Sequence, residues 1–259
     1  MIMSDLIESR LRVGSADGVR DIATLQRAGA SPGLFWLGGY RSEMTGAKAT
    51  ALDTFGAANG LAVTRFDYSG HGQSGGDFLE GTISRWLEEA LAVFATTKGP
   101  QIIIGSSMGG WLALLLNRML RTRGEARTKA LILIAPAVDM TEELMRSTFT
   151  PEEYEALATK GVIEQPSEYS SEPYPITAKL IEDGSRHLMF GGVIDTGCPV
   201  TILQGIKDPD VPHEHALKLV AHLLTDPVTL TLIPDGDHRL SREQDLRLLE
   251  TAVRRAMEE

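Results

Sequence analysis

The chain has 259 residues, 42% of them hydrophobic, which is enough apolar material for a large core. Its formal net charge of −10 and its pI near 5.1 argue against nucleic acid and anionic membrane surfaces as partners. The first ten residues, MIMSDLIESR, contain no secretory signal, and no run approaches the ~18 apolar residues of a membrane span. The single cysteine, Cys198, excludes an internal disulfide. We therefore expect a cytoplasmic protein without integral membrane association.

Short apolar runs rich in β-branched residues alternate with longer helical patterns along the chain. The first ~30 residues are expected to supply weaker antiparallel edge strands. The expected strands that follow are Leu34–Gly38, Leu61–Asp67, Gln101–Gly105, Ala130–Ala135, Val200–Gln204 and Val228–Ile233. The expected helices are Thr45–Ala58, Ile83–Thr97, Met108–Arg121, His213–Leu224 and Arg242–Met257.

Runs that are apolar on both faces and separated by helices are typical of a buried parallel sheet. The sequence therefore predicts a single α/β domain over residues 1–259. Its mostly parallel central sheet should have about eight strands, with helices on both faces.

The alternation breaks between residues 141 and 190. Here TPEEYEALATKG is typical of a helix and EQPSEYSSEPYP of a loop. A long insertion between two core strands is usually a lid or a binding element. We therefore expect residues 141–190 to form a small, mostly helical cap.

A serine between small residues directly follows one predicted strand. The motif G-x-S-x-G fits Gly105–Gly109, with Ser107 at its centre. A nucleophile at a sharp strand-to-helix turn has a positive φ, and the residues two positions away on either side must be small. Placing Ser106 at the centre would put an isoleucine and a methionine there, so Ser107 is the candidate nucleophile. A second match, Gly72–Gly76 around Ser74, lies beyond the end of its strand and starts no helix, which favours a loop.

A serine hydroxyl needs a base, and the base needs an orienting acid. Both should follow the serine along the chain, each just past the end of a later strand. Of the six histidines only His238 closes a strand, in VTLTLIPDGDHRL. His71 in DYSGHGQSGG and His187 in the cap remain weaker alternatives that could line the pocket. The other three share one amphipathic helix and are expected at the surface: His213, His215 and His222.

Three aspartates compete for the acid. Asp208, in VTILQGIKDPDVP, lies a short turn beyond its strand and is the preferred candidate. Asp210 shares that turn but is nearer to the start of the next helix, where an acid has a capping role. Asp139, in ILIAPAVDM, also closes a strand and is the main alternative.

Two backbone N–H groups are expected to form an oxyanion hole. One is that of Met108, which follows the nucleophile at the start of a helix, where the dipole favours negative charge. The other is that of Tyr40, because Gly38 and Gly39 let the backbone approach the substrate there. The turn DYSGHGQS is expected to support this face, and no metal or cofactor is expected.

With these residues in place, the chain resembles the α/β-hydrolase superfamily over nearly its whole length. The resemblance rests on LGGY, RFDYSGHGQSGG, GSSMGGW, LQGIKDPDVP and DGDH, in that order. Within the superfamily, GYRSEMTGAKA, GSSMGGWL, CPVTILQGIKDPDVP and DHRLSR are similar to mitochondrial and bacterial palmitoyl-protein thioesterases and acyl-glucuronide esterases. This resemblance implies that Ser107, Asp208 and His238 are nucleophile, acid and base.

The expected function is therefore a serine esterase or thioesterase that works through an acyl-enzyme on a small-molecule or S-acylated substrate. A peptidase, another hydrolase of the same fold, and a non-catalytic binding protein are the alternatives. Arg41 and Arg186 could instead receive a carboxylate on the leaving group. Apolar cap residues could wrap an acyl chain or only seal the cap onto the core: Leu144, Met145, Phe149, Tyr154, Leu157, Leu188, Met189 and Phe190.

Overall fold

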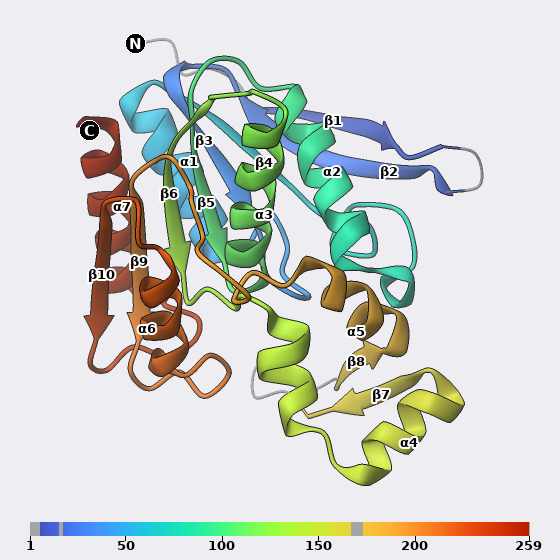
Figure 1. Cartoon of the computed structure of the whole chain (residues 1–259). Helices are drawn as coiled ribbons and strands as arrows, with labels where there is room; N and C mark the ends of the chain where they lie inside the picture. The colour runs from blue at the N-terminus through green and yellow to red at the C-terminus, as the bar shows by residue number, and fades with distance from the viewer. Residues whose placement is uncertain (1–5, 16–17, 167–172, 259) are drawn as a thin grey trace.

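A twisted central sheet organises the molecule in the computed structural model, which describes residues 6–15, 18–166 and 173–258. Within the described residues this sheet has eight strands, in the order β1-β2-β4-β3-β5-β6-β9-β10 (Figure 1). Their bounds are β1 Leu6–Val13, β2 Arg20–Arg27, β3 Ala30–Leu37, β4 Leu61–Phe66, β5 Gln101–Ser106, β6 Thr128–Ile134, β9 Val200–Gly205 and β10 Val228–Ile233.

The pairing is parallel from β4 to β10, whereas β1 pairs antiparallel with β2, and β2 antiparallel with β4. The predicted mostly parallel sheet of about eight strands, with an antiparallel N-terminal edge, is thus confirmed.

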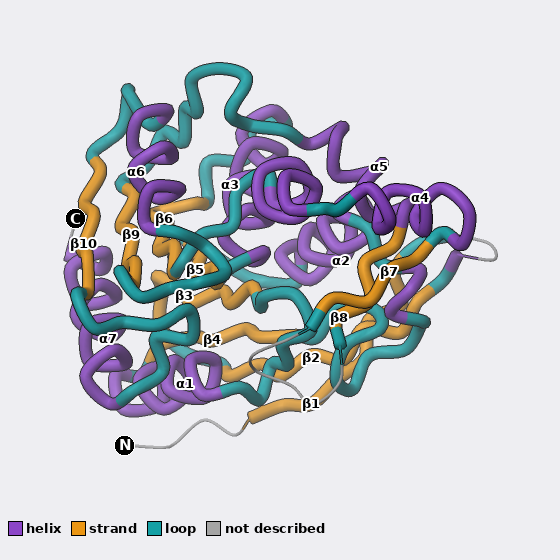
Figure 2. The backbone as a smooth tube through the Cα atoms, turned by 90° about the horizontal axis from the view of Figure 1, so that it is seen from below, coloured by secondary structure: helices purple, strands orange, loops and turns teal. Residues whose placement is uncertain are grey.

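Helices cover both faces of this sheet, as Figure 2 shows in a view from below. Helices α1 (Ala47–Asn59) and α7 (Glu243–Glu258) pack on one face, and α2 (Ile83–Ala95), α3 (Met108–Thr122) and α6 (His213–His222) on the other. Successive side chains of a strand point to opposite faces. Accordingly, Ile102 and Ile104 belong to the cluster under α1 and α7, whereas Ile103 belongs to the cluster under α2 and α3.

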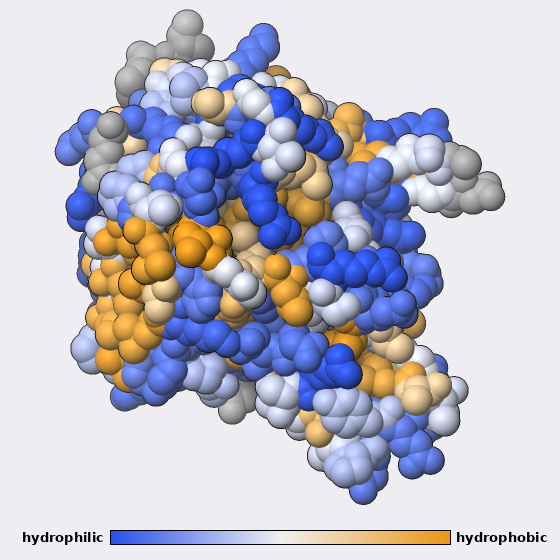
Figure 3. Space-filling model, in the orientation of Figure 1, coloured by the Kyte–Doolittle hydropathy of each residue, from blue (hydrophilic) through white to orange (hydrophobic). Residues whose placement is uncertain are grey.

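The two edges of the sheet differ in character. Strand β1 exposes charged side chains, which discourage edge-to-edge pairing with another chain. Apolar side chains instead gather along the β10 edge, at the left of Figure 3, and Leu224 and Leu232 are exposed there. Among the described helices, none combines the length and apolar content required to span a bilayer.

The described residues of the segment 141–190 lie beyond the C-terminal ends of the parallel strands (Figure 1). The predicted helix is present as α4, whose start is fixed by a capping box between Thr150 and Glu153. The segment consists of η3 Thr141–Met145, η4 Arg146–Thr148, α4 Pro151–Lys160, β7 Val162–Gln165, β8 Tyr174–Thr177, α5 Ala178–Gly184 and η5 Ser185–His187.

The prediction of a mostly helical segment missed one feature, because β7 and β8 pair antiparallel as a separate small sheet. The expected loop EQPSEYSSEPYP provides one end to each strand, and its residues 167–172 lie outside the described part of the chain. A small cluster of Phe149, Leu157, Ile163 and Ile176 forms the interior of this cap.

Candidate active site

Ser107 occupies the turn between β5 and α3. Its backbone has φ 54° and ψ −121°, a strained conformation for a residue with a side chain. A Cβ atom added to Gly105 would lie 2.1 Å from the carbonyl oxygen of Gly109, and one added to Gly109 would lie 2.1 Å from that of Leu37. Neither glycine can therefore carry a side chain, which is the physical reason for the G-x-S-x-G spacing.

The structure brings Ser107, His238 and Asp208 together in one hydrogen-bonded row. His238 Nε2 lies 3.1 Å from Ser107 Oγ, and His238 Nδ1 lies 2.8 Å from Asp208 Oδ2. Because an ionised carboxylate only accepts, Nδ1 carries the imidazole proton, and Nε2 is left as the acceptor for the serine hydroxyl. This is the arrangement that proton transfer from the serine requires.

The Asp208 carboxylate is completely buried and held by the backbone. Its Oδ1 accepts the N–H groups of Asp210 and Val211 at 2.9 and 2.8 Å. Oδ2, which faces His238, also lies 3.3 Å from the amide nitrogen of Gln204. The turn after β9 thus fixes the orientation of the acid before any substrate arrives.

Asp139 has a different set of partners. Its carboxylate accepts the backbone N–H groups of Met189 and Phe190 at 2.8 to 2.9 Å, and burial raises its pKa. Its own φ is 54°, at the end of the loop that leaves β6. Asp139 therefore anchors the end of the cap to the core.

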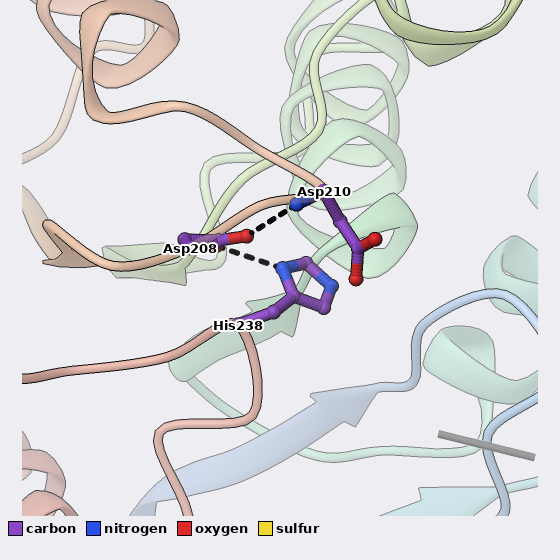
Figure 4. A group of neighbouring side chains, drawn as sticks. All are labelled: Asp208, Asp210 and His238. Carbon is purple, nitrogen blue, oxygen red and sulfur yellow. Dashed lines mark hydrogen bonds and ion pairs between the residues drawn. The ribbon is translucent and has the colours of Figure 1, made fainter. Parts of the chain in front are cut away.

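Asp210 is exposed, and its carboxylate lies beside the ring of His238 (Figure 4). Ligand atoms of Asp208, Asp210 and His238 all lie within 4.8 Å of one another, a separation that a metal ion could bridge. However, Asp208 and His238 already pair with each other, and Asp208 Oδ1 accepts two backbone N–H groups. A cation here would displace those bonds, so the cluster suits proton transfer better than metal binding.

The remaining histidines and Ser74 have structural surroundings. His187 Nε2 lies 2.7 Å from Ser84 Oγ, which also donates to Asp183 of the cap. The expectation that His215 lies at the surface is wrong, because its ring is buried 5.3 Å from that of Phe190. Ser74 Oγ donates to the Asp67 carbonyl and accepts the Ala23 N–H, so its hydroxyl is committed to holding this turn.

The two N–H groups expected to form an oxyanion hole flank the nucleophile. A Cβ atom on Gly39 would lie 3.2 Å from Ser107 Cβ, so the loop after β3 approaches the serine as closely as a backbone can. Within the described ranges, the N–H groups of Tyr40 and Met108 have no hydrogen-bond acceptor. Both are therefore available to a ligand.

A pocket of about 590 Å³ opens beside Ser107 and His238. Its charged lining residues are Arg41, Lys48, Glu143, Asp210 and Arg239. Its apolar lining residues are Ala137, Met140, Leu144, Met145, Ile176 and Val211. The pocket therefore combines apolar residues, half of those named coming from the cap, with charged residues around the same serine.

Of the eight cap residues considered for acyl-chain binding, this lining includes Leu144 and Met145. The other six pack within the cap, pack against the main core, or are exposed: Phe149, Tyr154, Leu157, Leu188, Met189 and Phe190. Of these six, Met189 and Phe190 pack against the main core and so seal the cap onto it, whereas Phe149 and Leu157 pack inside the cap.

Lys48 and Arg239 were not singled out from the sequence. Lys48 Nζ donates to the carbonyl oxygen of Arg239, the residue after His238, and burial lowers the pKa of Lys48 to about 8. Its position in the first turn of α1, directly after the oxyanion loop, was the available signal. Arg186 lies away from this lining and pairs with Glu182 at 3.3 Å.

Comparisons with known proteins show which family the chain belongs to. The sequence profile described as "Serine aminopeptidase, S33" matches residues 42–162. The mouse protein "Palmitoyl-protein thioesterase ABHD10, mitochondrial" is 36% identical over 233 residues, which cover 88% of this chain and 76% of that protein. The chain belongs to the ABHD10 family of α/β hydrolases. Human ABHD10 is 35% identical over 231 residues, covering 88% of this chain and 74% of its own.

Solved structures agree with this assignment. A putative hydrolase from Agrobacterium vitis S4 is 51% identical with a TM-score of 0.95, over 97% of this chain and 99% of that one. Mouse ABHD10 is 31% identical with a TM-score of 0.86, over 97% and 98% of the two chains. The α/β-hydrolase resemblance inferred from the sequence motifs is thus confirmed.

Proposed function

We propose that the chain is a serine hydrolase that cleaves acyl esters or acyl thioesters through an acyl-enzyme. The observation that carries the proposal is the row Ser107–His238–Asp208, placed at a strained turn that opens into a pocket. Mouse ABHD10, named as a palmitoyl-protein thioesterase, agrees with this substrate class.

In the first half-reaction, Ser107 Oγ attacks the acyl carbonyl while His238 Nε2 takes the hydroxyl proton. Asp208 keeps Nδ1 protonated and stabilises the imidazolium that forms. The negative charge on the carbonyl oxygen is received by the N–H groups of Tyr40 and Met108. Collapse of this intermediate releases the leaving group, which takes its proton from His238.

In the second half-reaction, water replaces the leaving group. His238 Nε2 takes a proton from the water as it attacks the acyl-enzyme, and the same two N–H groups receive the oxyanion. When this second intermediate collapses, Ser107 recovers its proton from His238 and the carboxylic acid departs. Every proton therefore moves through one imidazole nitrogen.

We expect esters and thioesters to be cleaved faster than amides. A thiolate or an activated alcohol leaves readily, whereas an amide nitrogen must be protonated as it departs and needs closer positioning. The apolar wall around Leu144 and Met145 offers a surface for an acyl chain, at about 0.8 kcal/mol per buried CH₂. On that basis kcat/KM should rise by well over tenfold from acetyl to octanoyl esters.

A second candidate is recognition of a carboxylate on the leaving group, which the presence of Arg41 in the pocket lining favours. A flat chain-length series, together with fast cleavage of an acyl glucuronide that Arg41→Ala abolishes, would support this candidate instead.

The proposal is tested by labelling the protein with a fluorophosphonate and by assaying matched p-nitrophenyl esters, a thioester and an anilide. Labelling at Ser107 with hydrolysis of the esters and the thioester is expected. Absence of labelling in a folded protein would favour a non-catalytic binding protein, and comparable anilide cleavage would favour a peptidase.

A further inference from the structure

A buried histidine, His71, holds the loop after β3, residues 38–46, in place on the side of the core. The backbone N–H of Arg41 donates to His71 Nε2 at 3.1 Å, and His71 Nδ1 lies 3.1 Å from the carbonyl oxygen of Ser69. The first bond requires an unprotonated Nε2, and the second requires a proton on Nδ1. Burial lowers the pKa of His71 to about 4, which keeps the ring in this neutral form.

The surroundings of His71 prevent its ring from turning. Its side chain is almost fully buried, and the rings of Tyr68, Phe78 and Trp86 lie 5.7, 5.1 and 5.3 Å from its own. The acceptor offered to Arg41 is therefore fixed in direction. This is more than a packing role requires, since an apolar ring would fill the same space.

The backbone that His71 holds is strained. Arg41 has φ 55°, a left-handed conformation that is unfavourable for a residue with a Cβ atom. The bond to His71 orients the peptide plane between Tyr40 and Arg41. Tyr40 is the residue whose own N–H is assigned to the proposed oxyanion site, and the bond to His71 lies one peptide away from that N–H.

The cap holds the same two residues from the opposite side. The Tyr40 hydroxyl donates to the carbonyl oxygen of Pro175 in β8, and Arg41 Nη1 donates to that of Pro173 at 2.7 Å. The Arg41 guanidinium also lies 5.5 Å from the ring of Tyr174. Burial raises the pKa of the Tyr40 phenol, so it remains a donor.

We propose that His71 and the Tyr40 hydroxyl are positioning residues that hold the Tyr40 backbone N–H in place for the oxyanion, His71 from the core and the hydroxyl through cap strand β8. The inference rests on the proposed function, which gives that N–H its role. Because β8 also contributes Ile176 to the pocket wall, a substrate that fills the pocket presses on the strand that holds the oxyanion loop. Binding of a longer acyl chain should therefore raise kcat as well as lower KM.

The first test compares His71→Phe, which keeps an aromatic ring but loses the acceptor, with His71→Gln, whose amide oxygen can accept the Arg41 N–H. His71→Phe should lower kcat about 10- to 100-fold with little change in KM, because a displacement near 1 Å has this effect. The Ki of a trifluoromethyl ketone, which forms an oxyanion on Ser107, should rise by the same factor. His71→Gln should recover most of both losses. Fluorophosphonate titration supplies the active-site concentration for each variant.

The second test needs no change in the core and remains decisive if His71→Phe does not fold. Tyr40→Phe removes one hydroxyl and keeps the backbone N–H. It should lower kcat for an octanoyl ester several-fold more than for an acetyl ester. The matched control is Tyr154→Phe, because the Tyr154 hydroxyl donates to the Arg146 carbonyl inside the cap and holds no part of the oxyanion loop.

The inference is overturned if Tyr40→Phe behaves like Tyr154→Phe with both esters, or if a folded His71→Phe keeps the wild-type Ki for the ketone. In either case the Ser107→Ala variant separates the failure of this inference from the failure of the proposed function. If Ser107→Ala is inactive, the proposed function stands without the inference. If Ser107→Ala is active, both are refuted.

Discussion

Asp208→Asn is the substitution for which the structure makes the sharpest prediction. In the native protein Oδ1 accepts the N–H groups of Asp210 and Val211, while Oδ2 faces His238 Nδ1. The single oxygen of an asparagine will keep the two backbone bonds, so its NH₂ group turns toward His238. An NH₂ group donates to Nδ1, which moves the imidazole proton to Nε2. In that tautomer His238 cannot accept the Ser107 proton.

The size of the effect follows from this reversal. Loss of the correct tautomer costs about 10⁴-fold in kcat in a serine protease, or about 5 kcal/mol of transition-state stabilisation. The amide nitrogen of Gln204 lies 3.3 Å from Oδ2, so in the variant it would face the NH₂ group of the asparagine. This contact between two donors adds a smaller energetic cost in the ground state. KM should change little, because neither oxygen of Asp208 lines the pocket.

Asp139→Asn is the control for this experiment. Its carboxylate accepts the N–H groups of Met189 and Phe190, so an asparagine would set its NH₂ group against one of them. The cost of an unmade buried hydrogen bond is about 1–3 kcal/mol. We expect a Tm lowered by about 2–4 °C per kcal/mol, with kcat reduced less than tenfold.

The assay measures kcat on a p-nitrophenyl ester, with enzyme concentration fixed by fluorophosphonate titration and folding followed by thermal unfolding. Reversed effects, with the larger kcat loss in Asp139→Asn, would refute the reasoning and assign the acid to the loop after β6. Equal losses in both variants would also refute it.

Three further predictions concern the nucleophile, the pH profile and the cysteine. Ser107→Ala should abolish ester hydrolysis and probe labelling, whereas Ser106→Ala and Ser74→Ala should keep most activity; a folded but inactive Ser106 variant would contradict the elbow assignment. As pH falls, kcat/KM should fall, because a protonated His238 cannot accept the serine proton, and a rate that is flat between about pH 5 and 8 would argue against a histidine base. Burial raises the pKa of Cys198 to about 11, so a disulfide reagent at pH 8 should label it only after unfolding in guanidinium.

The sheet was predictable because its strands are defined locally. A run such as QIIIG places three successive isoleucines on both faces of a strand, and such a run is stable only between two layers of helix. The observed strand ends differ from the predicted ones by a few residues, as with Ala30–Leu37 against the predicted Leu34–Gly38. The start of β3, Ala30–Pro32, is short of large apolar side chains and largely exposed, and its pairing with β4 gives it strand character that its composition does not.

The arrangement of the site was predictable for a related reason. Parallel strands deliver their C-terminal ends to one edge of the sheet, so residues that close β5, β9 and β10 must approach one another. Chain order and strand ends were therefore enough to select Ser107, Asp208 and His238 among many serines, aspartates and histidines. Sequence alone left Asp139 open, since it closes β6 equally well, and its cap partners, fifty residues away, decide its role.

The cap was less predictable because its stability depends on contacts between distant segments. Strands β7 and β8 are four residues each and are joined through a polar stretch, so neither has a pattern long enough to recognise. The burial of His215 was also unpredictable because it depends on a contact between distant segments. Its helix has an amphipathic pattern that leaves this position ambiguous, and the ring of Phe190, which arrives from the end of the cap, buries it. A contact of the same long-range kind brings His71 to the loop that contains Tyr40. The sequence therefore predicts that DYSGHGQS supports this face, but it does not identify the backbone atom that is supported.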